Sequence, residues 1–232
     1  MDTHKPIRLI FLINIAALLL ASCKIAYYPT SFNAPMMSSK GDAQIAGAIG
    51  VGNLEIQTAY ALTNNLGAMI NGSYFSEVKE LTINDQVQKV QLSHNYIEGG
   101  LGNFGSIGKI GRYELFAGGG IGTVPADFRN TYFDGSQTAN MTKFFIQPAF
   151  GMRTNMLDFA GVFRLSSIKI NNETNYFAEP GVVLKLGYKA VKFYANAGLS
   201  LPYHHSGSQS WDHNFFIIGL GVQVNIKRGE KN

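Results

Sequence analysis

The sequence lacks cysteine pairs that could form disulfides, clusters of Lys and Arg, and long apolar runs beyond its N-terminus. Its 232 residues include a single cysteine, Cys23, so no intramolecular disulfide can form. Charged residues make up 15% of the chain, and the net charge of +4 has no Lys/Arg cluster behind it, which argues against a nucleic-acid partner. Beyond the first two dozen residues, no apolar run approaches the roughly 20 residues that a spanning helix needs.

The N-terminal residues 1–22 have the pattern of a secretory signal peptide. Lys5 and Arg8 precede about a dozen apolar residues, which end in small residues. Asn14 interrupts the run, which is too short to span a membrane as a helix. We expect residues 1–22 to be cleaved.

The end of that segment, Leu20-Ala21-Ser22-Cys23, resembles the bacterial lipobox. The resemblance implies that Cys23 is acylated, with palmitate or a similar chain, and becomes the new N-terminus. It also implies handling by the lipoprotein-sorting machinery. The alternative is cleavage elsewhere, with Cys23 incidental. Residues 23–40 contain Pro29 and Pro35 and are expected to form an extended, lipidated linker.

From about Gly41 onward, apolar residues recur at every second position, which is the period of a β-strand with one apolar face. The last segment shows this best, because its apolar residues are all even-numbered: Phe216, Ile218, Leu220, Val222, Val224 and Ile226. Alternation of this kind predicts ten strands, at 42–51, 53–63, 66–76, 90–102, 112–122, 143–153, 156–168, 178–188, 191–201 and 216–226.

The connections between these segments alternate in length. Those at 63–65, 103–108, 154–155 and 189–190 are short, whereas those at 76–89, 123–140, 171–176 and 202–213 are mostly longer. Only the first hairpin, around 50–53, is short on the long-loop side. Short turns on one rim and long loops on the other are typical of an outer-membrane barrel.

The predicted fold is therefore all-β: a closed antiparallel up-and-down barrel of about ten strands, with eight or twelve possible, over residues 41–227. Residues 228–232 are left as a polar tail. A soluble sandwich is disfavoured because its strands are usually five or six residues long. A lipocalin-like barrel would place its apolar residues inside.

The pattern over residues 41–226 resembles the small outer-membrane β-barrel proteins of Gram-negative envelopes, in a lipid-anchored variant. The resemblance implies an outer-membrane location, with the lipid bilayer and the barrel-assembly machinery as partners. One difference is that such barrels often end on an aromatic residue, whereas this chain ends its last strand at Ile226.

By parity, the small or polar face carries charges of both signs. Because buried charges persist only when they are paired, we expect a network that fills the lumen. Its expected members are Glu55, Glu114, Asp158, Arg164, Glu179, Lys185 and Lys192. A narrow channel is the alternative, although water channels are typical of barrels nearer 16 strands.

One glycine-rich motif resembles a cofactor site. Residues 100–105 match G-x-G-x-x-G, but a dinucleotide site needs a strand before it and a helix after it, and a second alternating strand follows here. Gly118, Gly120 and Gly122 instead indicate a thin wall that leaves room for a bulky neighbour. No cofactor is expected.

The last long loop gathers the other candidates: His204, His205, Ser206, Asp212 and His213. Asp with His resembles the dyad of outer-membrane aspartyl-type proteases, Ser with His resembles lipid A deacylases, and three imidazoles could bind zinc. Asp127 and Asp134 are the obvious second partners to test. We expect no enzyme and no metal site, but a structural or adhesive barrel whose lumen is plugged by polar residues. A protease or lipid A-modifying enzyme remains the rival.

Overall fold

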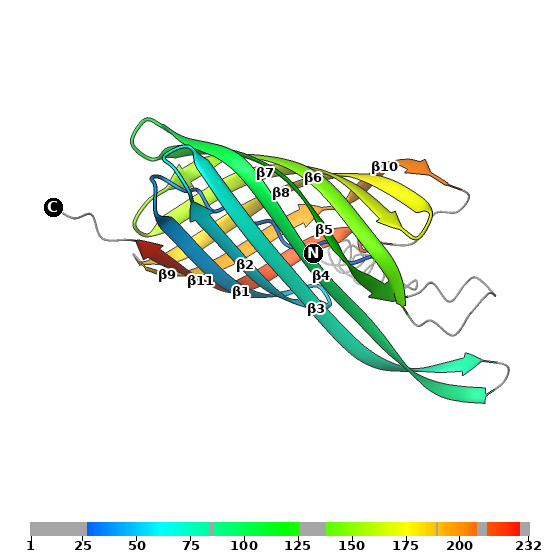
Figure 1. The fold of residues 1–232 in the computed structure, drawn as a ribbon. Helices are drawn as coiled ribbons and strands as arrows, with labels where there is room; N and C mark the ends of the chain where they lie inside the picture. Colours follow the sequence, from blue (N-terminus) through cyan, green and yellow to red (C-terminus); the bar gives the residue numbers. More distant parts are fainter. Residues whose placement is uncertain (1–26, 84–85, 126–137, 189, 208–212, 228–232) are drawn as a thin grey trace, which may run out of the picture.

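A computed structural model describes residues 27–83, 86–125, 138–188, 190–207 and 213–227, and the strands among them form one closed sheet (Figure 1). The strands are β1 (Asp42–Gly50), β2 (Asn53–Ala61), β3 (Leu66–Ile83), β4 (Gln86–Ile107), β5 (Gly111–Pro125), β6 (Thr138–Arg153), β7 (Leu157–Ile170), β8 (Glu173–Tyr188), β9 (Val191–Leu199), β10 (Leu201–Ser206) and β11 (Phe216–Lys227). Among the described residues, no helix has the length and apolar character to cross a membrane.

The barrel closes as the sequence predicted. β1 pairs antiparallel with β11, with Ala43 opposite Ile226, and β11 pairs with β9. β9 and β10 both pair with β8, and only Ser200 separates them, so together they make one strand of the wall. The predicted closed antiparallel barrel of ten strands is confirmed.

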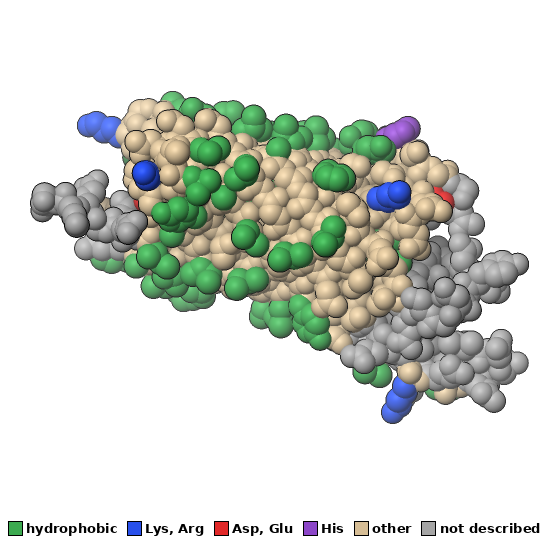
Figure 2. Space-filling model, in the orientation of Figure 1, with side chains coloured by type: hydrophobic (Ala, Val, Ile, Leu, Met, Phe, Trp, Pro, Cys, Tyr) green, Lys and Arg blue, Asp and Glu red, His purple; other side chains and the backbone are tan. Residues whose placement is uncertain are grey.

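The period of two sorts the side chains between the two faces of the wall. In β11, Leu220 is 61% exposed on the outside, whereas Gln223 is 4% exposed and faces the lumen. The other strands repeat this arrangement, with large apolar side chains exposed outside and the polar side chains buried inside. The inner face also carries buried aromatic rings, such as those of Phe104, Phe116 and Phe177. Figure 2 shows the apolar side chains spread along the visible wall, with Lys and Arg toward its two ends.

The two rims of the barrel differ. The short-turn rim carries the connections at 62–65, 108–110, 154–156 and 189–190, together with the end of β11. The long-loop rim carries the connections at 126–137 and 207–215 and the β3–β4 hairpin, which projects well beyond the wall in Figure 1. It also carries two tight turns, at 51–52 and 171–172.

Three of the predicted long connections are wrong in extent. The segment 76–89 is largely strand, because β3 and β4 continue to Ile83 and Gln86 as a paired hairpin. The segment 171–176 is a tight turn, since β8 begins at Glu173. The segment 202–213 contains most of β10. In each case backbone pairing continues into a stretch where apolar and polar residues no longer alternate regularly. The apolar–polar alternation alone therefore underestimates strand length.

Residues 27–38 are not part of the wall and are called the luminal segment below. The sequence predicts an extended linker over 23–40, and the described part of it is indeed non-helical and largely without strand. Its position was not anticipated. Residues 29–37 are all buried, and their hydrogen-bond partners lie on the inner faces of strands around the barrel. The segment runs through the lumen.

Candidate functional site

The luminal segment cannot join the barrel as a strand. Pro29 and Pro35 have no backbone N–H to donate, and Met36 has a positive φ of 54°. A main chain buried without neighbouring strands still needs partners for its N–H and C=O groups. Side chains of the barrel wall supply them.

Near the long-loop rim, the wall holds Thr30 and Ser31. The Arg164 guanidinium donates to the Thr30 carbonyl at 2.8 Å, and both oxygens of the Glu55 carboxylate accept from the Ser31 N–H, at 2.9 and 3.2 Å. The Lys143 ammonium donates to the Thr30 hydroxyl at 3.3 Å. A cation and an anion on opposite sides of the chain thus bind successive backbone groups.

Toward the short-turn rim, further wall side chains bind the main chain in sequence. Lys185 donates to the Ala34 carbonyl at 2.7 Å, and the Glu114 carboxylate accepts from the Met37 N–H at 2.9 Å. The remaining contacts on this side are Gln147 to the Asn33 carbonyl, Gln44 to the Pro35 carbonyl, Arg153 to the Met36 carbonyl and the Ser38 N–H to Asp42. The segment is therefore held along its whole length.

Ion pairs connect the lining residues with one another. Arg164 pairs with Glu179 at 2.6 Å, and Lys192 pairs with Asp158 at 2.6 Å. Lys143 pairs with Glu98 at 3.2 Å, and Arg153 pairs with Asp42 at 3.0 Å. Such pairs persist in a dry interior because each charge also has hydrogen-bond partners.

The structure places all seven residues of the expected lumen network on the inner face, each no more than 7% exposed. It brings Arg164 together with Glu179 and Asp158 with Lys192. Glu55, Glu114 and Lys185 bind the luminal segment instead. Sequence reasoning did not include Asp42, Glu98, Lys143 and Arg153 in this network, although each occupies an inward-facing position in the alternation of its own strand.

The wall is also shaped to the luminal segment. A Cβ atom added at Gly181 or Gly198, which face each other on β8 and β9, would collide with the Phe32 ring. A Cβ at Gly219 would collide with the Ser31 hydroxyl. Arg164 lies over the Phe32 ring, 4.8 Å from its centroid. Glycines of the wall thus provide the space that side chains of the luminal segment occupy.

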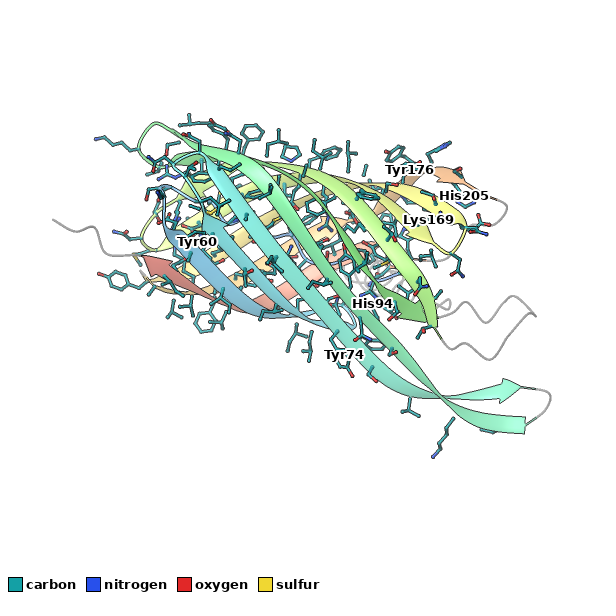
Figure 3. All side chains as sticks on the ribbon, viewed as in Figure 1. Tyr60, Tyr74, His94, Lys169, Tyr176 and His205 are labelled. Carbon is teal, nitrogen blue, oxygen red and sulfur yellow. The ribbon has the colours of Figure 1, made fainter. Side chains whose placement is uncertain are left out.

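The histidines of the last loop each have a different partner. His205 interacts with Asn175 and lies 3.5 Å from the Glu173 carboxylate. His213 donates to the Ser200 carbonyl at 3.1 Å and packs edge-on against Phe177, while the ring of His204 lies 5.4 Å from that of Tyr176. Figure 3 shows His205 and Tyr176 at the same end of the barrel.

A serine–histidine pair that the sequence analysis did not identify lies inside the barrel. Ser73 Oγ and His94 Nε2 are 3.0 Å apart, on adjacent strands β3 and β4. His94 is fully buried, and its Nδ1 has no hydrogen-bond partner among the described residues. A nucleophile–base pair needs a group to orient the base and access for a substrate. Among the described residues no group binds Nδ1 to orient the His94 ring, and the ring itself is fully buried.

The glycine motifs have structural positions. Residues 100–105 lie within β4 and are followed by β5, so no helix follows the motif. Gly120 and Gly122 lie opposite Glu98 and Tyr96 across the β4–β5 ladder, and a Cβ at Gly120 would collide with the Tyr96 hydroxyl. The thin wall thus makes room for an aromatic ring, as the sequence suggested.

Several candidates lie outside the described residues. These are Cys23, the signal peptide 1–22, the tail 228–232, Asp127, Asp134 and Asp212. Among the residues that the structure describes, no group of three or more His, Cys, Asp or Glu side chains is placed to hold a metal ion.

Comparison with known proteins gives no family assignment, since no protein-family model and no curated protein matches this sequence.

Proposed function

We propose that the chain is a lipid-anchored outer-membrane β-barrel protein, closed by its own luminal segment, whose work is structural or adhesive and is carried by the long-loop rim. The observation that carries this proposal is the polarity of the wall. The outside is apolar, and the charged side chains of the wall are buried in the lumen among aromatic and aliphatic ones, whereas a soluble ligand-binding barrel turns its charged residues outward.

The exposed apolar side chains of the outer face are evidence that the barrel is surrounded by a lipid bilayer. Ile56, Ile97, Ile121, Phe193 and Leu220 are each between 53% and 70% exposed. Apolar exposure this extensive is rare on soluble monomers and marks an interaction surface. Within the closed wall the strands pair on both sides, as hydrocarbon requires, and the edges paired on one side belong to the β3–β4 extension and to β10 at the long-loop rim.

Aromatic residues lie toward both ends of the outer face, and all those named here are exposed except Tyr176, which is half-buried. Tyr60 and Tyr188 lie near the short-turn rim, whereas Tyr74, Tyr176 and Tyr203 lie toward the long-loop rim. Figure 3 shows Tyr60 at one end and Tyr176 at the other. Two bands of this kind are typical of membrane–water interfaces. They support an orientation with the barrel axis across the bilayer.

The luminal segment supports a closed rather than a conducting barrel. It occupies the lumen from one rim toward the other, and wall side chains bind its main chain throughout. We include no reaction in the proposal, because His204, His205 and His213 are each turned to a different partner.

Lipidation and membrane insertion are tested together by fractionating cells that express the wild type and Cys23→Ser. We expect labelled fatty acid on the wild type alone. The wild type should also enter the outer-membrane fraction and migrate differently on a gel when unboiled, as folded membrane barrels do. Equal labelling of both proteins would contradict acylation at Cys23, and a soluble wild type would contradict the barrel's membrane role.

Closure is tested separately, in planar bilayers. The wild type should show no steady conductance, whereas a variant in which residues 29–37 are replaced by a short Gly-Ser linker should conduct ions. Matching gel mobility of the two unboiled proteins controls for folding. Steady conductance of the folded wild type would favour the narrow-channel alternative.

A further inference from the structure

The two ends of the described chain lie at opposite rims. A barrel with an even number of up-and-down strands begins and ends on the same rim, and here Asp42 at the start of β1 lies opposite Lys227 at the end of β11. A chain entering β1 directly would therefore begin at the short-turn rim. The luminal segment instead carries it back through the lumen.

The contacts of the segment trace this path in order. Ser38 binds Asp42 at the short-turn rim, and the Met37 N–H donates to Glu114, which lies near the start of β5 at the same rim. Farther along, Ser31 binds Glu55, which lies near the start of β2 at the long-loop rim.

The segment reaches the long-loop rim at Tyr27. Its backbone forms a parallel bridge with His213, and the Asn214 N–H donates to the Tyr27 carbonyl at 2.9 Å. Both partners belong to the 207–215 connection. The ring of Tyr28 packs against Gly52 of the β1–β2 turn on the same rim.

We infer that the mature chain upstream of Tyr27 emerges at the long-loop rim, so that the N-terminal anchor and the C-terminus lie on opposite sides of the membrane. The inference rests on the proposed function, because it takes Cys23 as the lipidated residue. Four residue steps from Cys23 to Tyr27 reach at most about 14 Å. This is about half the thickness of a hydrocarbon core of roughly 30 Å, so the lipid must enter the leaflet at the long-loop rim.

The experiment places a protease-cleavage site at one of three positions in the full chain: directly before Tyr27, at residues 84–85 between β3 and β4, or after Asn232. Each variant is treated with impermeant protease in intact cells and again in permeabilised cells. We expect the first two sites to be cut from the same side and the third only from the other side.

Two other results are informative. Cleavage of the N-terminal site from the same side as the C-terminal site, with the 84–85 site on the opposite side, would overturn the inference and leave the spanning barrel intact. All three sites on one side would contradict the spanning barrel itself, and with it the proposed function.

A second measurement covers the case in which an inserted site disturbs folding. The purified Cys23→Ser protein carrying Tyr27→Cys and His213→Cys should form an intramolecular disulfide upon mild oxidation, seen as a gel shift that a reductant reverses. The matched control pairs Tyr27→Cys with Asn155→Cys in the short-turn rim and should not crosslink. Crosslinking of the control alone would overturn the inference.

Discussion

The luminal segment and β1 are consecutive stretches of extended chain, separated only by residues 39–41, yet they are held in different ways. β1 pairs with β2 and β11 on both sides, backbone to backbone. The luminal segment has no strand beside it over residues 28–38, and individual wall side chains bind its backbone groups. A ladder tolerates the loss of any one side chain, whereas this second arrangement depends on each of them.

The largest effect is expected where one side chain serves both regions. Arg164→Met removes the partner of Glu179 in the wall and the donor to Thr30 in the luminal segment. Leaving Glu179 buried without a counter-charge should lower the free energy of unfolding by about 3–5 kcal/mol. Urea unfolding in detergent micelles measures this.

The matched control is Lys169→Met on the same strand, where the side chain is exposed. We expect a change within about 0.5 kcal/mol there. Equal losses in the two variants would mean that the buried pair contributes nothing beyond a surface charge.

The second prediction addresses the outer face of the wall alone. Leu220 faces outward near the middle of β11, and Arg at the midplane on a lipid face costs about 2–4 kcal/mol. Leu220→Arg should therefore reduce folding into vesicles, while Leu220→Val should fold normally. If Leu220→Arg folded into vesicles as well as Leu220→Val, this face would not be in contact with lipid.

The third prediction separates the two regions. Glu55→Ala deprives the buried Ser31 N–H of its acceptor, a loss of about 1.5–3 kcal/mol for a hydrogen bond to a charged group. Hydrogen exchange should become faster at Ser31 and stay slow at Ile45 in β1. Equal acceleration at both amides would mean that the luminal segment and the wall open as one unit.

The control for that experiment is Glu173→Ala, which removes a carboxylate at the long-loop rim beside His205. Exchange at Ser31 should not change in this variant.

The fourth prediction tests the fit between the wall and the luminal segment. The nearest atoms to a Cβ at Gly219 all belong to the side chains of Ser31 and Asn196. Overpacking of this kind costs about 1–3 kcal/mol, so Gly219→Ala should destabilise and Ser31→Gly should partly restore stability. Gly47→Ala, where a Cβ meets nothing within 4 Å, is the neutral control. Additive losses in the double variant would contradict a direct contact.

The smallest effect is expected at the long-loop rim. His205 and Glu173 are 3.5 Å apart and partly exposed. Exposed pairs contribute about 0–1 kcal/mol, so His205→Ala should shift the thermal midpoint very little. A large loss of stability would show that the rim is part of the core structure rather than a surface free for interactions.

Much of the barrel could be predicted from local pattern. The alternation within β11 determines which of its side chains face outward. The corresponding alternation within their own strands places Glu55, Arg164 and Glu179 on the inner face. Strand ends were less predictable. β3 and β4 extend to Ile83 and Gln86 through backbone pairing, for which the side-chain pattern gives no signal.

The sequence by itself determined the all-β class, the period of two and which side chains of each strand face outward, because these follow from local geometry at successive residues. Closure, which the sequence predicted, is made by the long-range pairing of β1 with β11. Only the tertiary structure decided that residues 27–38 run inside the barrel. Their prolines and irregular pattern indicate extended chain and nothing more. Their position depends on Glu55, Glu114, Arg164 and Lys185, which come from β2, β5, β7 and β8 and converge only when the barrel closes.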